Sequence, residues 1–339
     1  MRYFPLLLLV SVLFSCSQKE ATFEIRQSEF IYETEPFPEC HASTMEELPD
    51  GRLIAAWFGG TEERNPDVGI WSSIYQQGAW SEPVLLADGV QNDTLRYPCW
   101  NPVLYQWPGG RLSLYYKVGP SPSTWWGMEK SSNDGGATWA EAKRLPEGIL
   151  GPIKNKPVEV APGVVISPSS TEGPEGWKSH VEISKVQGAT WQRVNIDHAS
   201  DRQVIQPTIL LHPGGRIQVL CRSKHDRLYT SWSEDQGQTW SPLEATALLN
   251  PNAGADGVTL ADGRQLLVYN PTLRGEEWSH GRNKLAVGLS DDGVNWRELL
   301  LLEDQPEGEF SYPAVIQTKD GRIHITYTWK REKVRHAVL

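Results

Sequence analysis

The sequence is poor in cysteine and has no excess of positive charge. It contains 4 cysteines in 339 residues, and its 32 lysines and arginines are outnumbered by 42 aspartates and glutamates, which gives a formal net charge of −10. Binding to a nucleic-acid backbone requires a basic face, so this balance argues against nucleic acid as a partner. The cysteines show no CxxC or Cys/His spacing, and we therefore expect neither a metal site nor a cofactor.

Long helical patterns are also missing. No apolar run after the N-terminal region is long enough to span a membrane, and no hydrophobic period of 3.6 residues extends over a useful length. The chain is nevertheless that of a globular protein, because 39% of its residues are apolar and only 22% are charged. What it has in abundance is tryptophan and glycine-containing turns between β-rich runs.

The N-terminus has the features of an export signal. Arg2 precedes an apolar run over residues 3–14, too short for a membrane-spanning helix, and the run is followed by Cys16 in the sequence LFSC. This segment resembles the lipobox of bacterial lipoproteins, in which the cysteine is lipidated and becomes the first residue. We expect a signal peptide over residues 1–15, then lipidated Cys16 and a polar leash over residues 16–21. The exported protein would be held by this lipid at a periplasmic or cell-surface membrane face; a plain secretory signal is the alternative.

Tight-turn signals recur six times between β-rich runs. The dipeptides Asp-Gly and Gly-Gly between alternating apolar residues indicate β-hairpins, because the two central positions of the hairpin turn favour φ > 0. The turns lie about fifty residues apart, a period typical of propellers and solenoids. Their glycines are Gly51, Gly110, Gly163, Gly215, Gly263 and Gly321.

A second turn motif alternates with these hairpins. Residues 132–139 and 233–240 match the pattern S-x-D-x-G-x-T-W in full, and degenerate copies occur at 73–80, 184–191 and 290–296. The aspartate can cap backbone amides, the glycine supplies a positive φ, and the tryptophan packs between sheets. The motif therefore stabilises a fold and performs no chemistry itself.

The sixth repeat is incomplete. Only 18 residues follow Gly321, with no second turn, so the last unit lacks an outer strand. The run at residues 22–26 can supply that strand and close the ring, which removes exposed sheet edges. We predict one all-β domain over residues 22–339, a monomeric six-bladed β-propeller closed by an N-terminal strand. Cys40 and Cys99 hold similar positions in consecutive repeats, so they could pair, but buried free thiols are the favoured interpretation.

The turns resemble the Asp-boxes, or BNR repeats, of the sialidase-like superfamily over residues 22–339. The resemblance implies a retaining exo-glycoside hydrolase that releases a terminal acidic sugar, sialic acid or a related one, from glycans. A tyrosine activated by a glutamate is the nucleophile there, because the substrate carboxylate would repel an anionic one. Three arginines bind that carboxylate, and a loop aspartate protonates the leaving oxygen. Asp-boxes also occur in non-enzymatic propellers, so function must be argued from the site.

Polar residues at the starts of the inner strands should converge on one pocket. In a propeller each inner strand begins near the central axis, here about ten residues before its hairpin turn, where a ligand can bind. Polar groups that only solvate the channel mouth are the alternative interpretation. The residues are His41 and Tyr312, for which we expect catalytic roles, and Asn101, Lys156, Gln206 and Asp256, for which we expect substrate contacts.

Several parts of the sialidase site have counterparts in the sequence. Tyr312, in the segment FSYPAV, corresponds to the nucleophile. Arg282 resembles the third arginine of the family, and Arg227, six residues before the Asp-box serine, resembles the second. The loop expected to carry the acid/base contains Glu62, Glu63 and Asp67, of which Asp67 is the nearest match.

Other parts are replaced. His41 stands in place of the first arginine, and Thr328 in place of the glutamate that orients this arginine. Gln206 takes the position of the glutamate that activates the tyrosine, and an amide cannot accept a proton. Glu309, three residues before Tyr312, is the candidate substitute.

Three functions remain open from the sequence. The first is the sialidase-type hydrolase, with Tyr312 as nucleophile, Asp67 as acid/base and two arginines on the carboxylate. The second is a uronate-specific lyase or an atypical glycosidase, in which His41 and Tyr312 move protons; the exchanges of arginine for histidine and of glutamate for glutamine favour it. The third is a glycan-binding propeller without catalysis.

Overall fold

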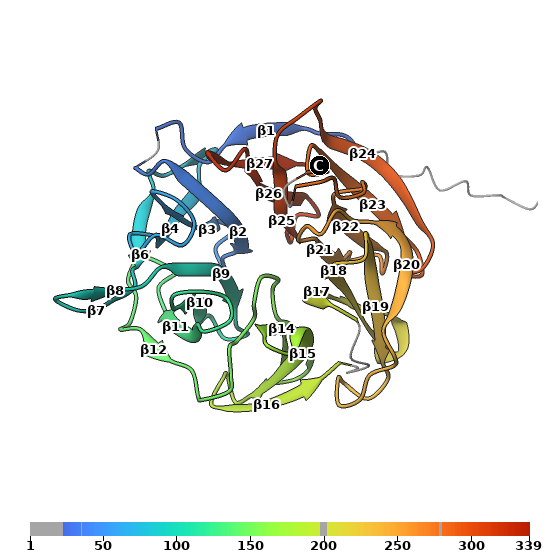
Figure 1. Cartoon of the computed structure of the whole chain (residues 1–339), viewed down its shortest axis with the longest axis horizontal. Coiled ribbons are helices and arrows are strands. Elements are labelled where there is room, and N and C mark those ends of the chain that lie inside the picture. Colours follow the sequence, from blue (N-terminus) through green and yellow to red (C-terminus); the bar gives the residue numbers. More distant parts are fainter. Residues whose placement is uncertain (1–22, 35, 197–201, 278–279) are drawn as a thin grey trace, which may run out of the picture.

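The computed structural model describes residues 23–34, 36–196, 202–277 and 280–339. Within these ranges the chain forms six antiparallel sheets that stand around a central axis like blades (Figure 1). The prediction of an all-β, six-bladed propeller is thereby confirmed. Cys16, the signal segment 1–15 and the leash 16–21 lie outside the described residues. No helix in the described part of the chain is long and apolar enough to cross a membrane.

Five blades are built from consecutive strands, with the first strand of each nearest the axis (Figure 1). A short hairpin of β7 (Val90–Asn92) and β8 (Leu95–Arg96) projects from the rim between the first two blades (Figure 1). The strands of the five blades are β2 (Glu39–Glu47), β3 (Leu53–Gly60), β4 (Gly69–Gln76), β5 (Ala79–Trp80) and β6 (Val84–Ala87); β9 (Cys99–Gln106), β10 (Leu112–Val118), β11 (Trp126–Ser132) and β12 (Lys143–Arg144); β13 (Val158–Ala161), β14 (Val164–Gly173), β15 (Gly176–Lys185) and β16 (Thr190–Asn195); β17 (Val204–Leu211), β18 (Ile217–Ser223), β19 (Arg227–Ser233) and β20 (Glu244–Leu249); and β21 (Asp256–Thr259), β22 (Gln265–Tyr269), β23 (Lys284–Ser290) and β24 (Trp296–Asp304).

The sixth blade joins segments from both ends of the chain. It consists of β25 (Phe310–Gln317), β26 (Ile323–Trp329), β27 (Lys333–Val338) and, outermost, β1 (Gln27–Phe30). The N-terminal strand thus closes the ring as predicted, but it comprises Gln27–Phe30, which pair with residues 335–338, and not residues 22–26. Phe23 instead packs against the hydrophobic core between the fifth and sixth blades, and the strand is formed by residues that follow it.

The two turn motifs fold as their residues dictate. All six glycine turns connect the inner strand of a blade to its second strand, and Gly51 and Gly321 adopt φ of 85° and 86°. In the Asp-box at 233–240, Asp235 accepts hydrogen bonds from the backbone N–H (2.8 Å) and the hydroxyl (2.6 Å) of Thr239. Trp240 of the same motif packs against the core between the third and fourth blades. These motifs are structural, as expected.

The core lies between the blades. Apolar side chains of neighbouring sheets form a series of buried clusters around the ring, of which the largest joins the first two blades. Cys40, Cys99 and Cys221 are all buried, and no disulfide joins them. The described residues contain no cluster of three or more histidine, cysteine or acidic side chains that could hold a metal ion.

Candidate functional site

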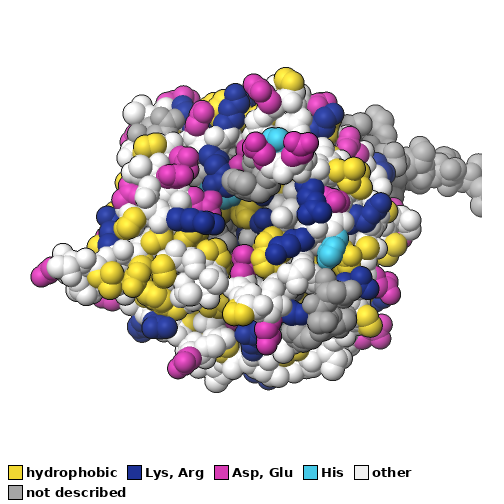
Figure 2. Space-filling view, viewed as in Figure 1, with side chains coloured by type: hydrophobic (Ala, Val, Ile, Leu, Met, Phe, Trp, Pro, Cys, Tyr) yellow, Lys and Arg dark blue, Asp and Glu magenta, His cyan; other side chains and the backbone are white. Residues whose placement is uncertain are grey.

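A cavity of about 530 Å³ opens where four inner strands, β2, β9, β17 and β25, begin near the axis. Figure 2 shows basic side chains gathered around a hollow near the centre of this face. Four arginines, four glutamates and three tryptophans contribute to the cavity wall. Of the residues predicted for the site, the wall contains His41, Asn101, Gln206, Arg282 and Tyr312, together with the loop residues Glu62 and Glu63.

Strained backbone aims three of these side chains inward. Asn101, Gln206 and Tyr312 each adopt a positive φ, of 38°, 54° and 52°. Each lies at a break in the pairing of an inner strand with its neighbour, a β-bulge, and each precedes a proline. Such a conformation costs about 1–3 kcal/mol per residue and is characteristic of functional sites, where a bulge redirects a side chain. In the first blade the equivalent break follows His41, and the strained residue is Ala42, with φ of 55°.

The hydroxyl of Tyr312 is the centre of a polar cluster. Arg222 on β18 donates a hydrogen bond to the tyrosine oxygen at 2.5 Å, and the amide of Gln206 donates another at 3.3 Å. Arg222 also donates to the Gln206 carbonyl at 3.2 Å, so the three side chains form a closed triangle. Gln206 therefore contacts the Tyr312 oxygen, as its position in the repeat predicted. It does so as a hydrogen-bond donor and not as a base.

Two further arginines are held by one buried carboxylate. Glu309 accepts hydrogen bonds from Arg282 at 2.7 Å and from Arg331 at 2.9 Å, and the Ser311 hydroxyl donates to it at 2.7 Å. Burial alone would raise the pKa of Glu309, but the charges of Arg282 and Arg331 outweigh burial and hold it well below the usual value. Glu309 does not line the cavity. Glu309 thus holds the two arginines and stands off the cavity wall, where the substitute base that the sequence predicts would have to lie.

His41 is buried against the tyrosine. Its ring centroid lies 4.1 Å from that of Tyr312, and neither of its ring nitrogens has a hydrogen-bond partner among the described residues. Burial lowers the pKa of His41 far below its usual value, and the nearby charge of Arg331 lowers it further. The imidazole is therefore neutral at pH 7, with one nitrogen able to accept a proton and the other able to donate.

The loop between β3 and β4 places its acidic residues differently from the prediction. The carboxylate of Asp67 accepts hydrogen bonds from the backbone N–H (3.0 Å) and hydroxyl (2.6 Å) of Thr61, which closes the loop at its base. Asp67 does not line the cavity, so its assignment as acid/base is not supported by the structure. Glu63 lines it, but it forms an ion pair with Arg331 at 2.5 Å.

Arg227 lies outside the site. It is the first residue of β19, is exposed, and donates weak hydrogen bonds to the carbonyls of Thr246 and Ala247 on the outer strand of its blade. Arg222 stands before the turn that connects β18 to β19, so its side chain reaches the cavity, whereas a residue after that turn does not. Arg227, which the sequence predicts as a substrate ligand, thus does not line the cavity, whereas Arg222 does.

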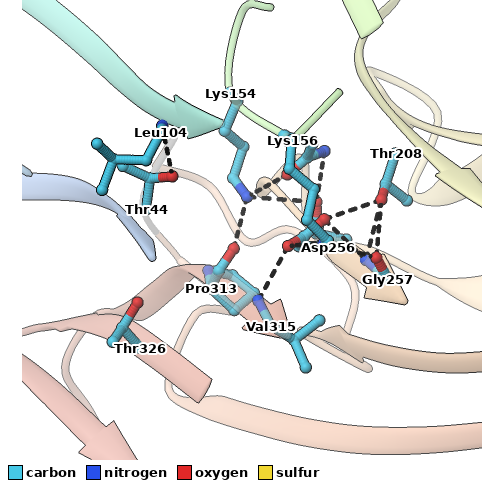
Figure 3. A network of polar contacts seen from close by, with 12 residues as sticks. Thr44, Leu104, Lys154, Lys156, Thr208, Asp256, Gly257, Pro313, Val315 and Thr326 are labelled. Atoms are coloured by element: carbon cyan, nitrogen blue, oxygen red, sulfur yellow. Dashed lines mark hydrogen bonds and ion pairs between the residues drawn. The ribbon is translucent and has the colours of Figure 1, made fainter. Parts of the chain in front are cut away.

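Lys156 and Asp256 hold the blades together deeper along the axis (Figure 3). Their side chains form an ion pair at 2.8 Å, and Asp256 also accepts hydrogen bonds from the Thr208 hydroxyl and from the backbone N–H of Val315, both at 2.9 Å. Lys154 nearby donates to the carbonyl of Pro313 at 2.6 Å. Neither Lys156 nor Asp256 lines the cavity, so the structure does not bring these two predicted substrate contacts to it.

The residues of the cavity wall that the sequence did not reveal include Arg222, Arg331, Trp177 and Glu172. Arg331 follows β26 in a turn, where it has φ of 61°, and nothing in its local sequence marks it as functional. Trp177 and Glu172 face each other across the hairpin of β14 and β15. Arg222 lies one residue before the end of β18, and none of the predicted turn motifs falls next to it.

Comparisons with known proteins agree with this fold. The model of the BNR repeat-like domain matches residues 51–325. A protein of unknown function from Dyadobacter fermentans superposes with a TM-score of 0.76 at 16% identity, over 93% of this chain and 98% of that one. For the K499G mutant of the NanB sialidase from Streptococcus pneumoniae the TM-score is 0.72 at 13% identity, over 91% and 70% of the two chains.

An α-L-arabinanase from Penicillium chrysogenum, solved with arabinobiose, has a TM-score of 0.68 at 16% identity, over 93% of this chain and 98% of that one. At such identities the likeness concerns the fold alone. A search of curated proteins found no match. Because the family model matches most of the propeller, the chain belongs to the BNR repeat-like domain family.

Proposed function

We propose that the protein is a retaining exo-glycosidase that removes a terminal acidic sugar from a glycan, with Tyr312 as the nucleophile. The observation that supports this most is the placement of the tyrosine oxygen, 2.5 Å from the Arg222 guanidinium, in a cavity that Arg282 and Arg331 also line. Guanidinium groups bind carboxylates through paired, charge-assisted hydrogen bonds. A sugar carboxylate bound by them would sit next to the attacking oxygen.

His41 would accept the proton of the tyrosine. The family uses a glutamate for this, and Gln206 stands in its place. His41 is neutral, packs on the Tyr312 ring and has a nitrogen without a hydrogen-bond partner in the described part of the chain. In this mechanism His41 on the first blade takes over the role of the glutamate that Gln206 replaces on the fourth blade. The two replacements in the sequence then belong together.

The test compares wild type with Tyr312→Phe on two fluorogenic substrates, 4-methylumbelliferyl α-N-acetylneuraminide and 4-methylumbelliferyl β-glucuronide. We expect release from one of them by wild type and a loss of at least about 100-fold in the variant, since the nucleophile is removed. Tyr105→Phe is the matched control, because Tyr105 is equally buried and lies outside the cavity. No release by folded wild type, or equal release by Tyr312→Phe, would overturn the proposal.

A second candidate function is a uronate-specific lyase. The contact between neutral His41 and Tyr312 favours it, because a lyase needs a base and an acid on one face of the sugar while arginines neutralise the uronate carboxylate. Its product is a 4,5-unsaturated uronate that absorbs in the ultraviolet, whereas hydrolysis gives a saturated sugar. Retention of a uronate-capped glycan without any product would identify a binding protein.

A further inference from the structure

The hairpin of β14 and β15 carries a glutamate into the cavity from the third blade. The Ser170 hydroxyl accepts a hydrogen bond from the backbone N–H of Gln206 at 3.2 Å, which fixes β14 beside the residue that contacts the Tyr312 oxygen. Side chains two residues apart on a strand point to the same face. Glu172 therefore points the same way as Ser170, and it lines the cavity.

The surroundings of Glu172 differ from those of the other acidic residues in the cavity. Glu63 is paired with Arg331, and Glu39 accepts a hydrogen bond from the backbone N–H of Glu63 at 3.4 Å. Glu62 is exposed on the loop. Burial raises the pKa of Glu172, which the charge of Arg222 and a hydrogen bond from Trp177 offset only in part. The surroundings of Glu172 therefore favour its protonated form.

We propose that Glu172 is the general acid/base of the reaction, in the role for which the sequence suggested Asp67. This inference rests on the proposed function. The hydrogen bond from Trp177 orients the carboxyl group, and Trp177 in turn lies over the guanidinium of Arg222, 5.1 Å from the ring centroid. Arg222 thus links the two groups, since it contacts Trp177, which bonds to the acid, and also the hydroxyl of Tyr312.

In the first step the bond between the anomeric carbon and the glycosidic oxygen breaks, and its electron pair stays on that oxygen. Glu172 gives its proton to the same oxygen, so the leaving group departs as a neutral alcohol. The Tyr312 oxygen forms the new bond to the anomeric carbon and its proton passes to His41. The products of this step are a glycosyl-tyrosine, a glutamate anion and a protonated imidazole.

In the second step a water molecule replaces the alcohol. The Glu172 carboxylate takes one proton from the water as its oxygen bonds to the anomeric carbon. The bond to Tyr312 breaks, its electron pair returns to the phenol oxygen, and His41 gives the proton back. Glu172 ends protonated, as it began, and the net reaction is hydrolysis with retention.

The test uses Glu172→Gln, with Glu175→Gln as the matched control because Glu175 is exposed at the tip of the same hairpin and does not line the cavity. Two substrates with one sugar are compared: 3′-sialyllactose, whose leaving group needs a proton, and the 4-methylumbelliferyl sialoside, whose leaving group does not. If wild type prefers the glucuronide, the corresponding glucuronide pair is used. Removing a general acid lowers the rate by about 10²–10⁴-fold.

For Glu172→Gln we expect this loss of rate on 3′-sialyllactose. On the 4-methylumbelliferyl substrate we expect a burst of methylumbelliferone followed by slow turnover. The glycosyl-tyrosine should accumulate and be visible by intact mass spectrometry, and azide, a nucleophile that needs no base, should restore turnover. The alkaline limb of the wild-type pH profile should be absent in Glu172→Gln.

Equal losses on both substrates without adduct or azide rescue, or no loss at all, would overturn the assignment of Glu172 while leaving Tyr312 in place. Inactive wild type, or active Tyr312→Phe, would instead overturn the proposed function and this inference with it. Melting temperatures of all variants establish that each is folded.

Discussion

Glu309 offers the sharpest test of the site's electrostatics. Replacing it with glutamine removes the one negative charge that Arg282 and Arg331 share, while the side chain keeps its shape. Arg282 is 1% exposed, so after the change its charge would stay buried without this carboxylate, although its hydrogen bond to the Asn252 carbonyl at 2.9 Å would remain. Arg331 keeps its ion pair with Glu63.

The expected loss of folding stability depends on the fact that Arg331 keeps an ion pair after the change. Breaking a buried ion pair by removing one partner destabilises a protein by about 3–5 kcal/mol. Because one of the two arginines stays paired, we expect the lower end, about 3 kcal/mol, for Glu309→Gln. At about 2.1 cal/mol/K of unfolding entropy per residue, a chain of 339 residues shifts by about 1.4 °C per kcal/mol, so the melting temperature should fall by about 4 °C.

The pH dependence gives an independent check. The pKa of Glu309 lies below its value in the unfolded chain, so its contribution to stability is complete above that unfolded pKa and is lost as the pH falls below it. The difference in stability between wild type and Glu309→Gln should therefore be largest at neutral pH and shrink in acid.

The assay is thermal unfolding at pH 7 and pH 4, followed by tryptophan fluorescence. Glu307→Gln is the matched control, since Glu307 is an exposed glutamate two residues away. A fall of less than about 2 °C at pH 7, or an equal fall for Glu307→Gln, would show that the arginines do not depend on this carboxylate.

Three other changes test the fold. Gly89→Ala should destabilise the rim hairpin, because a Cβ there would lie 1.6 Å from the Tyr97 carbonyl oxygen, whereas Gly173→Ala meets nothing within 4 Å; melting temperatures of the two variants decide this. Asp235→Ala should lower the melting temperature by a few degrees at pH 7 and less in acid, since hydrogen bonds from Thr239 lower the pKa of Asp235 and its contribution fades as the carboxylate is protonated; similar losses at both pH values would contradict this origin. Burial lowers the pKa of His324 to about 4, so wild type should lose stability as the pH falls from about 6.5 toward 4, by up to about 1.4 kcal/mol per pH unit. His324→Asn should flatten this dependence in urea titrations, and an unchanged slope would assign the loss to other groups.

The fold could be predicted because its signals are local. A glycine at a hairpin, such as Gly321, or an aspartate that caps its own turn, such as Asp235, acts within a few residues, so the sequence around it is sufficient. Six such units repeated at a regular spacing are compatible with few architectures, chiefly propellers and solenoids. The closing strand was misplaced by a few residues because both candidate segments are β-rich, and the packing of Phe23 decides between them.

The site could be predicted only in part, because its geometry depends on contacts between distant segments. Residues at inner-strand starts, such as Tyr312 and Gln206, were found from their place in the repeat. Arg331 was missed because its neighbour Glu63 is 268 positions away in the sequence. Glu172 was missed because a carboxylate at a hairpin end is ordinary until the hairpin is known to overhang a cavity.

The closure of the ring also determines when, during synthesis, the protein can complete its fold. The strand β1 is synthesised before every blade, but its partner β27 comes after all of them, and Gln27 pairs with Val338. Until residues 333–338 emerge, an open stack of blades presents unpaired edges at both ends, which invite pairing with other chains. Contacts so far apart in the sequence slow folding. The nascent chain must therefore pass through this open state, in which it needs protection from aggregation, before the fold is complete.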